Sequence, residues 1–243
     1  MKNILVLLGV AICVLGFAVP AKASGGAEHV EHAGVNTRDV AAAQRGAKWF
    51  INYCFSCHSA KYMRYKRLSE DLDLSEEMVM QNLVFSDAKI GETMEIAMQP
   101  GQAELWLGTL PPDLSLMARS RGVDWLYSYL KNFYQDEKGG WNNLNLPNAA
   151  MPHVLWQLQG IQEPVYTTQG GVQTVDHLVL AQPGLQSPEE YEKTVRDLVT
   201  FLDYLSEPAK LKRKNLGIWV MLFLTVFAGL TYALKVEYWR DVR

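Results

Sequence analysis

The segment with the clearest chemical potential is Cys54-Phe55-Ser56-Cys57-His58, in which two cysteines three residues apart are followed directly by a histidine. This C-x-x-C-H arrangement is the attachment signal for haem c. Each thiol can form a thioether to a vinyl group of the porphyrin, and the imidazole of His58 can bind the iron from one face. The chain has one other cysteine, Cys13. We therefore expect one covalently bound haem c.

Three other uses of paired cysteines compete with haem attachment. A structural disulfide suits an oxidising compartment, and a redox pair of the thioredoxin type has the same spacing. A zinc site would need more ligands, and the remaining histidines lack finger-like spacing. These histidines are His29, His32, His153 and His177. The motif lies at the end of an amphipathic pattern in a chain that we expect to be exported, which favours haem.

The ligand on the other face of the iron is harder to choose. Met151 lies in an irregular, proline-flanked stretch, far enough downstream for the chain to pass round the haem edge. We expect Met151 to be this ligand, with Met98 next, while His153 and His177 remain possible. The other methionines follow His58 too closely or lie in patterns typical of core helices, where Met98 also falls: Met63, Met78, Met80, Met94 and Met117.

Ligation by a histidine and a methionine has a functional consequence. A thioether favours ferrous iron and raises the reduction potential. With both faces coordinated, no position stays open for oxygen or peroxide. These properties indicate electron transfer rather than catalysis by the chain itself, whereas a peroxidase would need an open sixth position.

The first 23 residues are typical of a secretory signal peptide. Lys2 gives a basic start, residues 4–19 form a short apolar run, and Ala21-Lys22-Ala23 is a small-residue cleavage pattern. The alternative is an uncleaved N-terminal anchor, for which the run is short. We expect residues 1–23 to be removed and the following chain to be exported.

A second apolar stretch, residues 216–234, predicts one transmembrane helix. It contains no charged residue, and as a helix it would span about 28 Å, close to the hydrocarbon thickness of a bilayer. A buried core helix of this length would show a polar face, which this stretch lacks.

Basic residues flank this stretch on both sides, so the positive-inside rule alone does not orient it. The signal peptide decides the orientation instead. We expect residues 24–209 to form a periplasmic haem c domain, residues 210–215 a basic linker and residues 235–243 a cytoplasmic tail. The protein would then cross the inner membrane once.

Charge is distributed unevenly along the chain. Residues 24–209 contain 24 acidic and 14 basic side chains, a net charge of −10, against −3 for the whole chain. Such a domain disfavours nucleic acid and suits docking to basic proteins, since complementary fields raise encounter rates. Solubility alone is the competing explanation.

Two exported helices have clear start signals. Asp39 is expected to cap a helix over residues 40–51, and Ser187, followed by Pro188 and Glu190, begins a helix that extends to Leu205. The apolar faces of these two helices are expected to pack together. Gly46, within the first, would allow a close approach.

The remaining signals describe a mainly helical domain. They predict a loose lead-in at residues 24–36 and an irregular region at 136–152. They also predict helices over 76–84, over 111–121 and over 123–133, and a small β-hairpin between residues 165 and 180. The prolines Pro111 and Pro112 are expected to open the second of these helices, and Gly122 to end it.

The order of these motifs resembles the cytochrome c1 family of bacterial cytochrome bc1 complexes. The resemblance rests on the cysteine–histidine motif, on Leu110-Pro-Pro-Asp-Leu-Ser115, on Met151-Pro-His153 and on a single C-terminal span, and it covers nearly the whole mature chain. It implies a mainly α fold: a class I cytochrome c-like haem domain with an inserted loop and β-hairpin region, plus one C-terminal transmembrane helix. Residues 161–186 match the family least.

The resemblance also implies roles for individual residues. Cys54 and Cys57 would carry the covalent links, His58 and Met151 would be the axial ligands of the metal, and Pro111 and Pro112 would adjoin the haem. Arg121 would pair with a haem propionate, a group that a guanidinium fits well. Unaided, the sequence would class Arg121 as a surface charge.

The resemblance implies a function in the respiratory chain as well. The chain would accept one electron from the Rieske iron–sulfur protein and pass it to a soluble or tethered c-type cytochrome, beside cytochrome b. The alternatives are a haem c subunit of another membrane complex, such as a terminal oxidase, a catalytic haem protein, or a disulfide-bonded scaffold module.

Overall fold

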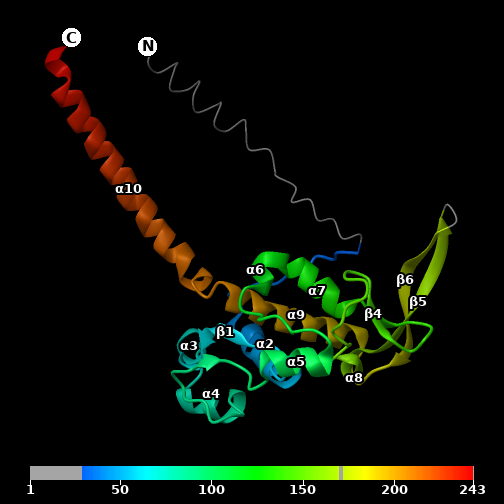
Figure 1. Ribbon diagram of the computed structural model, residues 1–243. Helices are drawn as coiled ribbons and strands as arrows, with labels where there is room; N and C mark the ends of the chain where they lie inside the picture. The colour runs from blue at the N-terminus through cyan, green and yellow to red at the C-terminus, as the bar shows by residue number, and fades with distance from the viewer. Residues whose placement is uncertain (1–28, 170–171, 243) are drawn as a thin grey trace.

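The computed structural model describes residues 29–169 and 172–242 (Figure 1). The expected signal peptide, residues 1–23, lies outside this part of the chain. Helices dominate, and the strands form antiparallel pairs. In chain order the elements are α2 (Val40–Tyr53), β1 (Ala60–Arg64), α3 (Tyr65–Asp71), α4 (Glu76–Leu83), β2 (Thr93–Met94), α5 (Pro100–Leu107), α6 (Met117–Arg121), α7 (Val123–Lys131), β3 (Phe133–Gln135), β4 (Trp141–Asn143), α8 (Trp156–Gln159), β5 (Gly160–Gln169), β6 (Val172–Pro183), α9 (Pro188–Ser206), α10 (Lys210–Tyr238) and the 3-10 turn η1 (Arg240–Val242).

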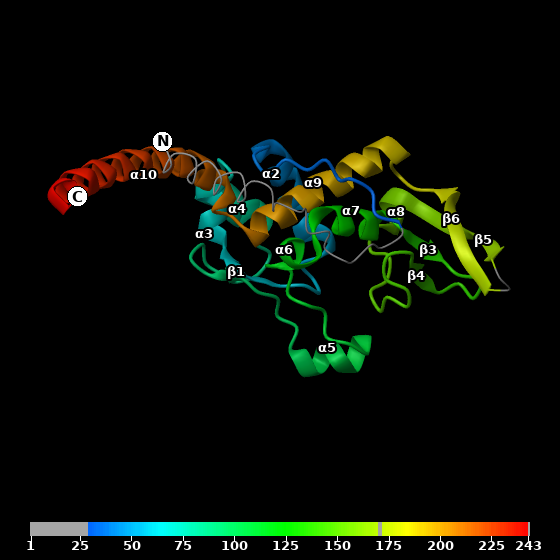
Figure 2. The same cartoon turned by 90° about the horizontal axis from the view of Figure 1, so that it is seen from above.

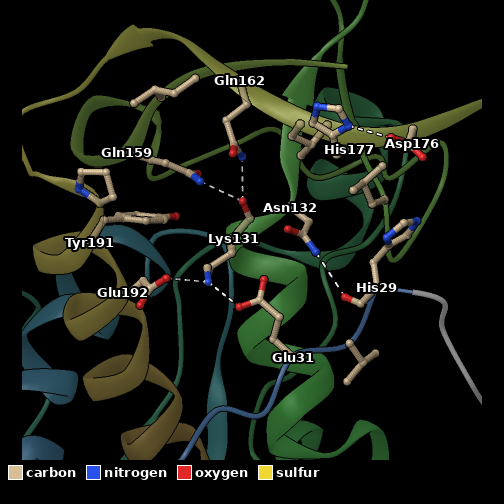
Figure 3. Close-up of a pocket in the computed structure, with 15 residues that line it drawn as sticks. His29, Glu31, Lys131, Asn132, Gln159, Gln162, Asp176, His177, Tyr191 and Glu192 are labelled. Atoms are coloured by element: carbon tan, nitrogen blue, oxygen red, sulfur yellow. Dashed lines mark hydrogen bonds and ion pairs between the residues drawn. The ribbon is translucent and has the colours of Figure 1, made fainter. Parts of the chain in front are cut away.

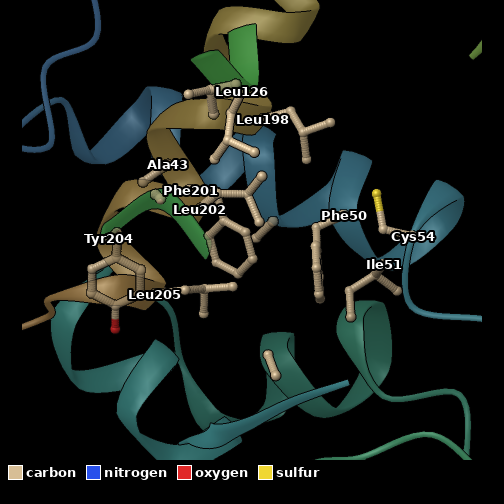
Figure 4. Close-up of a cluster of buried hydrophobic side chains, with 14 of the residues drawn as sticks. Ala43, Phe50, Ile51, Cys54, Leu126, Leu198, Phe201, Leu202, Tyr204 and Leu205 are labelled. Carbon is tan, nitrogen blue, oxygen red and sulfur yellow. The ribbon is translucent and has the colours of Figure 1, made fainter. Parts of the chain in front are cut away.

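Helices α2 and α9 pack against each other at the centre of the hydrophobic core (Figure 4). The rings of Phe50 and Phe201 meet there with their centroids 5.4 Å apart. Both helix starts are as expected: the Asp39 side chain accepts a hydrogen bond from the amide of Ala42, and Ser187 forms a capping box with Glu190. The predicted pairing of these two helices is confirmed.

Gly46 explains how closely the two helices approach. A Cβ atom at this position would overlap the backbone carbonyl oxygen of Asp197 and lie 2.7 Å from the Cβ of Phe201. Next to this contact, Arg45 donates to both carboxylate oxygens of Asp197, at 2.6 and 2.8 Å. The hydrogen bond to Asp197 raises the pKa of Arg45, so the guanidinium stays charged at the edge of the contact.

Some expected boundaries were wrong. Residues 110–114 form no helix, and α6 begins at Met117, because Pro111 and Pro112 lack amide hydrogens and the segment is held by contacts to residues 58–62 instead. Helix α7 ends at Lys131, and Phe133 begins strand β3. Met94 lies in strand β2, so Met94 and Met98 do not share a helix.

The hairpin of β5 and β6 is longer than expected and extends away from the helical body (Figures 1 and 2). The loose lead-in, by contrast, was wrong for residues 29–36. The Glu31 amide donates to Ser128 Oγ at 2.8 Å, the Ala33 amide donates to Asp124 at 2.8 Å, and Arg196 donates to the Ala33 carbonyl at 2.9 Å. This segment is therefore attached to α7 and α9.

Helix α10 begins at Lys210, so the expected basic linker forms its first turns. Lys210 lies 2.7 Å from Asp203 of α9, and Lys212 lies 3.3 Å from Asp71 of α3. Asp71 is almost fully buried and also accepts from the hydroxyl of Tyr204. From Asn215 to Tyr238 the helix is long and apolar enough to cross a membrane, and its most apolar window has no buried residue.

The close approach at Gly46 predicts a large effect of a small substitution. Gly46→Ala should lower the free energy of unfolding by about 2 kcal/mol, because the added methyl has no free volume and the helices must separate. Thermal unfolding followed by circular dichroism measures the change. The control is Gly101→Ala on the exposed helix α5, where no atom of the described chain lies within 4 Å of the new methyl. Equal stability of the two variants would contradict this account of the α2–α9 contact.

Candidate functional site

The cysteine–histidine motif forms a tight turn at the end of α2. Cys54 is the C-cap of the helix, and its carbonyl accepts from the amides of Cys57 at 3.1 Å and His58 at 2.9 Å. Helix α2 therefore fixes where both thiols and the imidazole lie. The side chain of Cys54 is directed into the core beside Phe50 and Ile51 (Figure 4).

The state of the two thiols bears on the competing uses of the motif. Both are free, so no disulfide joins them. Burial raises the pKa of the Cys54 thiol to about 12. A thioredoxin-type redox pair needs a thiolate stabilised near neutral pH, which this environment opposes. Within the described residues, no cluster of three or more His, Cys, Asp or Glu side chains could hold a metal ion such as zinc.

The imidazole of His58 has a defined orientation. Its Nδ1 lies 2.7 Å from the carbonyl oxygen of Pro112 and donates to it, which leaves Nε2 as the lone-pair nitrogen. Burial lowers the pKa of His58, while the hydrogen bond to Pro112 opposes that shift. The neutral form is the one that binds a metal. Pro112, predicted as a haem neighbour, thus orients the predicted iron ligand His58 through its carbonyl group.

The segment after Pro112 is held in place by hydrogen bonds to residues 59–62. The Asp113 carboxylate accepts from the amides of Lys61 and Ser115, both at 2.9 Å. The hydroxyl of the fully buried Ser115 accepts from the amide of Tyr62 at 3.1 Å, and the Leu114 amide donates to the Ser59 carbonyl at 2.8 Å. This set of contacts fixes the carbonyl that orients His58.

Helix α5 was not predicted from the sequence. The segments before and after it are both hydrogen-bonded to Ser59. The Ile96 amide donates to Ser59 Oγ at 3.0 Å before the helix, and Leu114 reaches Ser59 after it. Figure 2 shows α5 held away from the helical body. Leu105 is 80% exposed and Trp106 is 65% exposed. An apolar helix is therefore attached beside His58 with its large side chains uncovered.

Position in the fold separates the candidate methionines into two groups, since five lie in helices or strands and two do not. Met63 and Met94 are fully buried in the core strands β1 and β2, and Met78, Met80 and Met117 belong to α4 and α6. Met98 and Met151 are only partly buried and lie outside helices and strands. Met151 and Met98, the two methionines that the sequence ranked first, therefore remain the best candidates for the iron ligand. The choice of Met151 stays a prediction.

The two candidate histidines have other contacts. The ring of His153 stacks on Phe133 at 5.0 Å between centroids and meets the edge of Trp141. Burial lowers the pKa of His153 to about 4, as expected for a neutral core residue. His177 lies on the hairpin, 2.7 Å from Asp176.

His177 lines a cavity of about 580 Å³ between the N-terminal segment, α7, the hairpin and α9 (Figure 3). In it, Lys131 bonds to Glu31 and Glu192, and its carbonyl accepts from Gln159 and Gln162. Most of these polar groups bond to one another, although Gln159 Oε1 is buried without a hydrogen-bond partner in the described chain. The cavity therefore has the character of a structural network.

Arg121 lies at the exposed end of α6, with its guanidinium 5.1 Å from the ring centre of Trp125. Trp125 stacks on Tyr129, whose ring in turn meets the edge of Phe133. This aromatic row leads from Arg121 to His153, two residues beyond Met151. The spacing of four residues from Arg121 through Trp125 and Tyr129 to Phe133 is visible in the sequence, so this row could have been predicted.

The residues present fit a haem c group. Two free thiols at the required spacing adjoin an imidazole whose Nδ1 is occupied and whose Nε2 can bind iron. Comparison with known proteins agrees. The model of the cytochrome c1 family matches residues 31–104 and 87–242. The chain belongs to the cytochrome c1 family.

Individual relatives give the same result. The chain is 48% identical to cytochrome c1 of Allochromatium vinosum over 225 residues, covering 90% of this chain and 92% of that one. It is 46% identical to a protein of Nitrosomonas europaea named ammonia monooxygenase gamma subunit, covering 91% and 92%. It is 26% identical to the protein of Bradyrhizobium diazoefficiens named cytochrome b/c1, covering 84% of this chain and 34% of that protein.

Membership of the cytochrome c1 family confirms the predicted fold class, a mainly α haem domain with a β-hairpin and one C-terminal apolar helix. It also supports a haem c electron-transfer subunit of the cytochrome bc1 complex. The long hairpin β5–β6 covers the residues whose likeness to the family was weakest in the sequence.

The contacts of Asp113 predict a stability effect at the site. Asp113→Ala should lower the free energy of unfolding of the haem-loaded protein by about 2 kcal/mol, because two amides lose a charged acceptor. Denaturant unfolding followed by Soret circular dichroism measures it. The control, Asp87→Ala, removes an exposed carboxylate that accepts no hydrogen bond within the described chain. Unfolding at the same denaturant concentration in both variants would show that Asp113 does not support the site.

Proposed function

We propose that this cytochrome c1 carries one electron from a Rieske iron–sulfur protein to a soluble or tethered c-type cytochrome, inside a bc1 complex that includes cytochrome b. The observation that carries the proposal is the turn at residues 54–58, with the His58 imidazole oriented by Pro112. A relative named cytochrome b/c1 supports cytochrome b as the partner.

One haem c would be held through thioethers by Cys54 and Cys57, and His58 and Met151 would supply the ligands to its iron. When bound, the haem supplies a one-electron couple between ferric and ferrous iron. The Pro112 carbonyl raises the basicity of the His58 ring and keeps it in one orientation. The chain supplies no catalytic residue of its own.

Other residues shape the surroundings of the haem. Arg121 would bind a haem propionate through its guanidinium edge, while the flat face of the same group rests on Trp125. Leu105 and Trp106 of α5 would offer apolar surface to the porphyrin, since both are exposed on a helix whose flanking segments bond to Ser59, next to His58.

The electron carrier is anchored in the inner membrane by α10, which crosses it once. The haem domain faces the periplasm and residues 235–243 face the cytoplasm, an orientation supported by the signal peptide pattern. The net charge of −10 on residues 24–209 favours a basic electron acceptor and disfavours nucleic acid.

Met151→Leu tests the axial ligand. The haem should stay attached through its cysteines, while the midpoint potential falls by on the order of 0.1 V and ferrous iron binds carbon monoxide, because the sixth position opens. Redox titration and visible spectra measure both effects.

Met98→Leu is the matched control for this experiment, since Met98 is also partly buried and outside regular structure. It should leave the potential and the carbon monoxide response unchanged. The opposite pattern, with Met98→Leu altered and Met151→Leu normal, would assign the ligand to Met98.

Reconstitution tests the place of the chain in the complex. Affinity purification from membranes should recover cytochrome b and the Rieske protein with it, and quinol should reduce its haem. Extraction of the Rieske protein should slow this reduction at least tenfold, and adding that protein back should restore it. Rapid reduction without the Rieske protein would contradict the proposed donor.

The same purification separates the alternative assemblies. A haem c subunit of another membrane complex, such as a terminal oxidase, would recover different partners and no cytochrome b. One such complex is suggested by the relative from Nitrosomonas europaea, which is named as a subunit of ammonia monooxygenase. Recovery of monooxygenase subunits in place of cytochrome b would reject the bc1 assignment.

A further inference from the structure

A cavity of about 430 Å³ lies where the N-terminal segment meets the start of α10. Three of its six lining residues are cations. The lining consists of Val35, Asn36, Thr37, Arg38, Lys210 and Arg213. Nothing in the proposed electron-transfer function uses this place.

The charges around the cavity do not cancel. Lys210 pairs with Asp203 at 2.7 Å, and Arg213 pairs with Glu207. Arg38 forms no ion pair with any residue of 29–169 or 172–242. Three cations against two carboxylates leave one positive charge, which an anionic group can neutralise.

The neighbouring polar groups leave donors available. Thr37 donates its hydroxyl to Asp203, and Asn36 accepts from the Arg38 amide through its carbonyl oxygen, so the amide nitrogen of Asn36 remains a donor. The guanidinium of Arg38 is exposed. Guanidinium and amide donors suit the oxygens of a phosphate.

A shallow apolar groove, open to its surroundings and formed by α10 alone, lies farther along the helix than the cavity. It is lined by Gly217, Ile218, Met221, Leu222 and Thr225. A Cβ at Gly217 would meet no described atom within 4 Å, so the groove is open there.

The cavity and the groove lie on the same side of the helix. Lys210, Arg213, Gly217 and Met221 are spaced by three, four and four residues, which places them on one face of α10. At 1.5 Å of rise per residue, Arg213 lies about 3 Å before Asn215, where the apolar span begins. The cations therefore lie at the level of lipid headgroups if α10 crosses the membrane.

We propose that this face of α10 binds one anionic phospholipid, with its phosphate at Arg38, Lys210 and Arg213 and an acyl chain in the groove at Gly217. The inference rests on the proposed membrane crossing of α10. A neighbouring transmembrane helix could fill a groove at a glycine but would not use the cations. A free phosphate would use the cations but not the groove.

Native mass spectrometry of the full haem-loaded chain in detergent tests the site. The chain is incubated with phosphatidylglycerol or with phosphatidylcholine of the same acyl chains. The wild-type chain should retain one phosphatidylglycerol in preference to phosphatidylcholine. Arg38→Gln should weaken this retention about fivefold, because one unpaired cation is lost. Lys138→Gln, which removes an exposed cation of the β3–β4 turn, should have no effect.

Gly217→Leu tests the groove separately from the charges. The leucine should fill the open space and weaken retention of phosphatidylglycerol at least fivefold, while all ion pairs persist. The matched control is Gly229→Leu on the same helix, another position with no described atom within 4 Å of a new Cβ. The visible haem spectrum of every variant checks that the domain is folded.

Several results would overturn the lipid site. Equal retention of both lipids would do so, as would a normal Arg38→Gln variant. Displacement of the lipid by millimolar inorganic phosphate would indicate a free-anion site. A Gly217→Leu variant that keeps its lipid but loses cytochrome b would indicate a helix interface. Failure of the chain to float with vesicles would instead reject the membrane crossing, so the two failures are distinguishable.

Discussion

The hydrogen bond from His58 Nδ1 to the Pro112 carbonyl is the constraint on which the site depends. It joins two segments that are 54 residues apart in the chain, the turn after α2 and the segment before α6. A carbonyl group can orient an imidazole ring only if the carbonyl itself is held in place. Here the Pro112 carbonyl is held by the two restricted proline backbones and by the hydrogen bonds of Asp113 and Ser115. The packing of α2 on α9 fixes the other partner. The orientation of His58 therefore depends both on the packing of the core helices and on the hydrogen bonds that hold Pro112.

Much of this arrangement was predictable because its signals are local. Asp39 and Ser187 mark the starts of their helices, because each caps its helix through bonds to neighbouring residues only. Gly46 indicated the close helix contact, since a glycine within a helix is unfavourable without such a reason. The spacing of Cys54, Cys57 and His58 carries the chemistry by itself. The cytochrome c1 family assignment then followed from motif order and is confirmed by the family match.

Other features depend on long-range contacts that spacing does not encode. Residues 29–36 look too polar to order themselves, but Asp124 and Arg196 supply partners for their backbone. Asp71 resembles a surface acid in the sequence and is buried between Tyr204 and Lys212 in the structure. Helix α5 has a weak amphipathic pattern because most of its residues are exposed, so its sequence does not predict a helix. The place of Met151 opposite His58 remains a prediction for the same reason.

The two lysines at the start of α10 have a mechanical consequence. Lys210 is paired with α9 and Lys212 with α3, so the helix is attached to the domain at two points that lie on different elements. Two separate attachments resist both bending and rotation about the helix axis. Under the proposed function, this double attachment keeps the haem domain in a fixed orientation relative to its membrane helix. The larger movements during turnover would then fall to the proposed electron donor and acceptor.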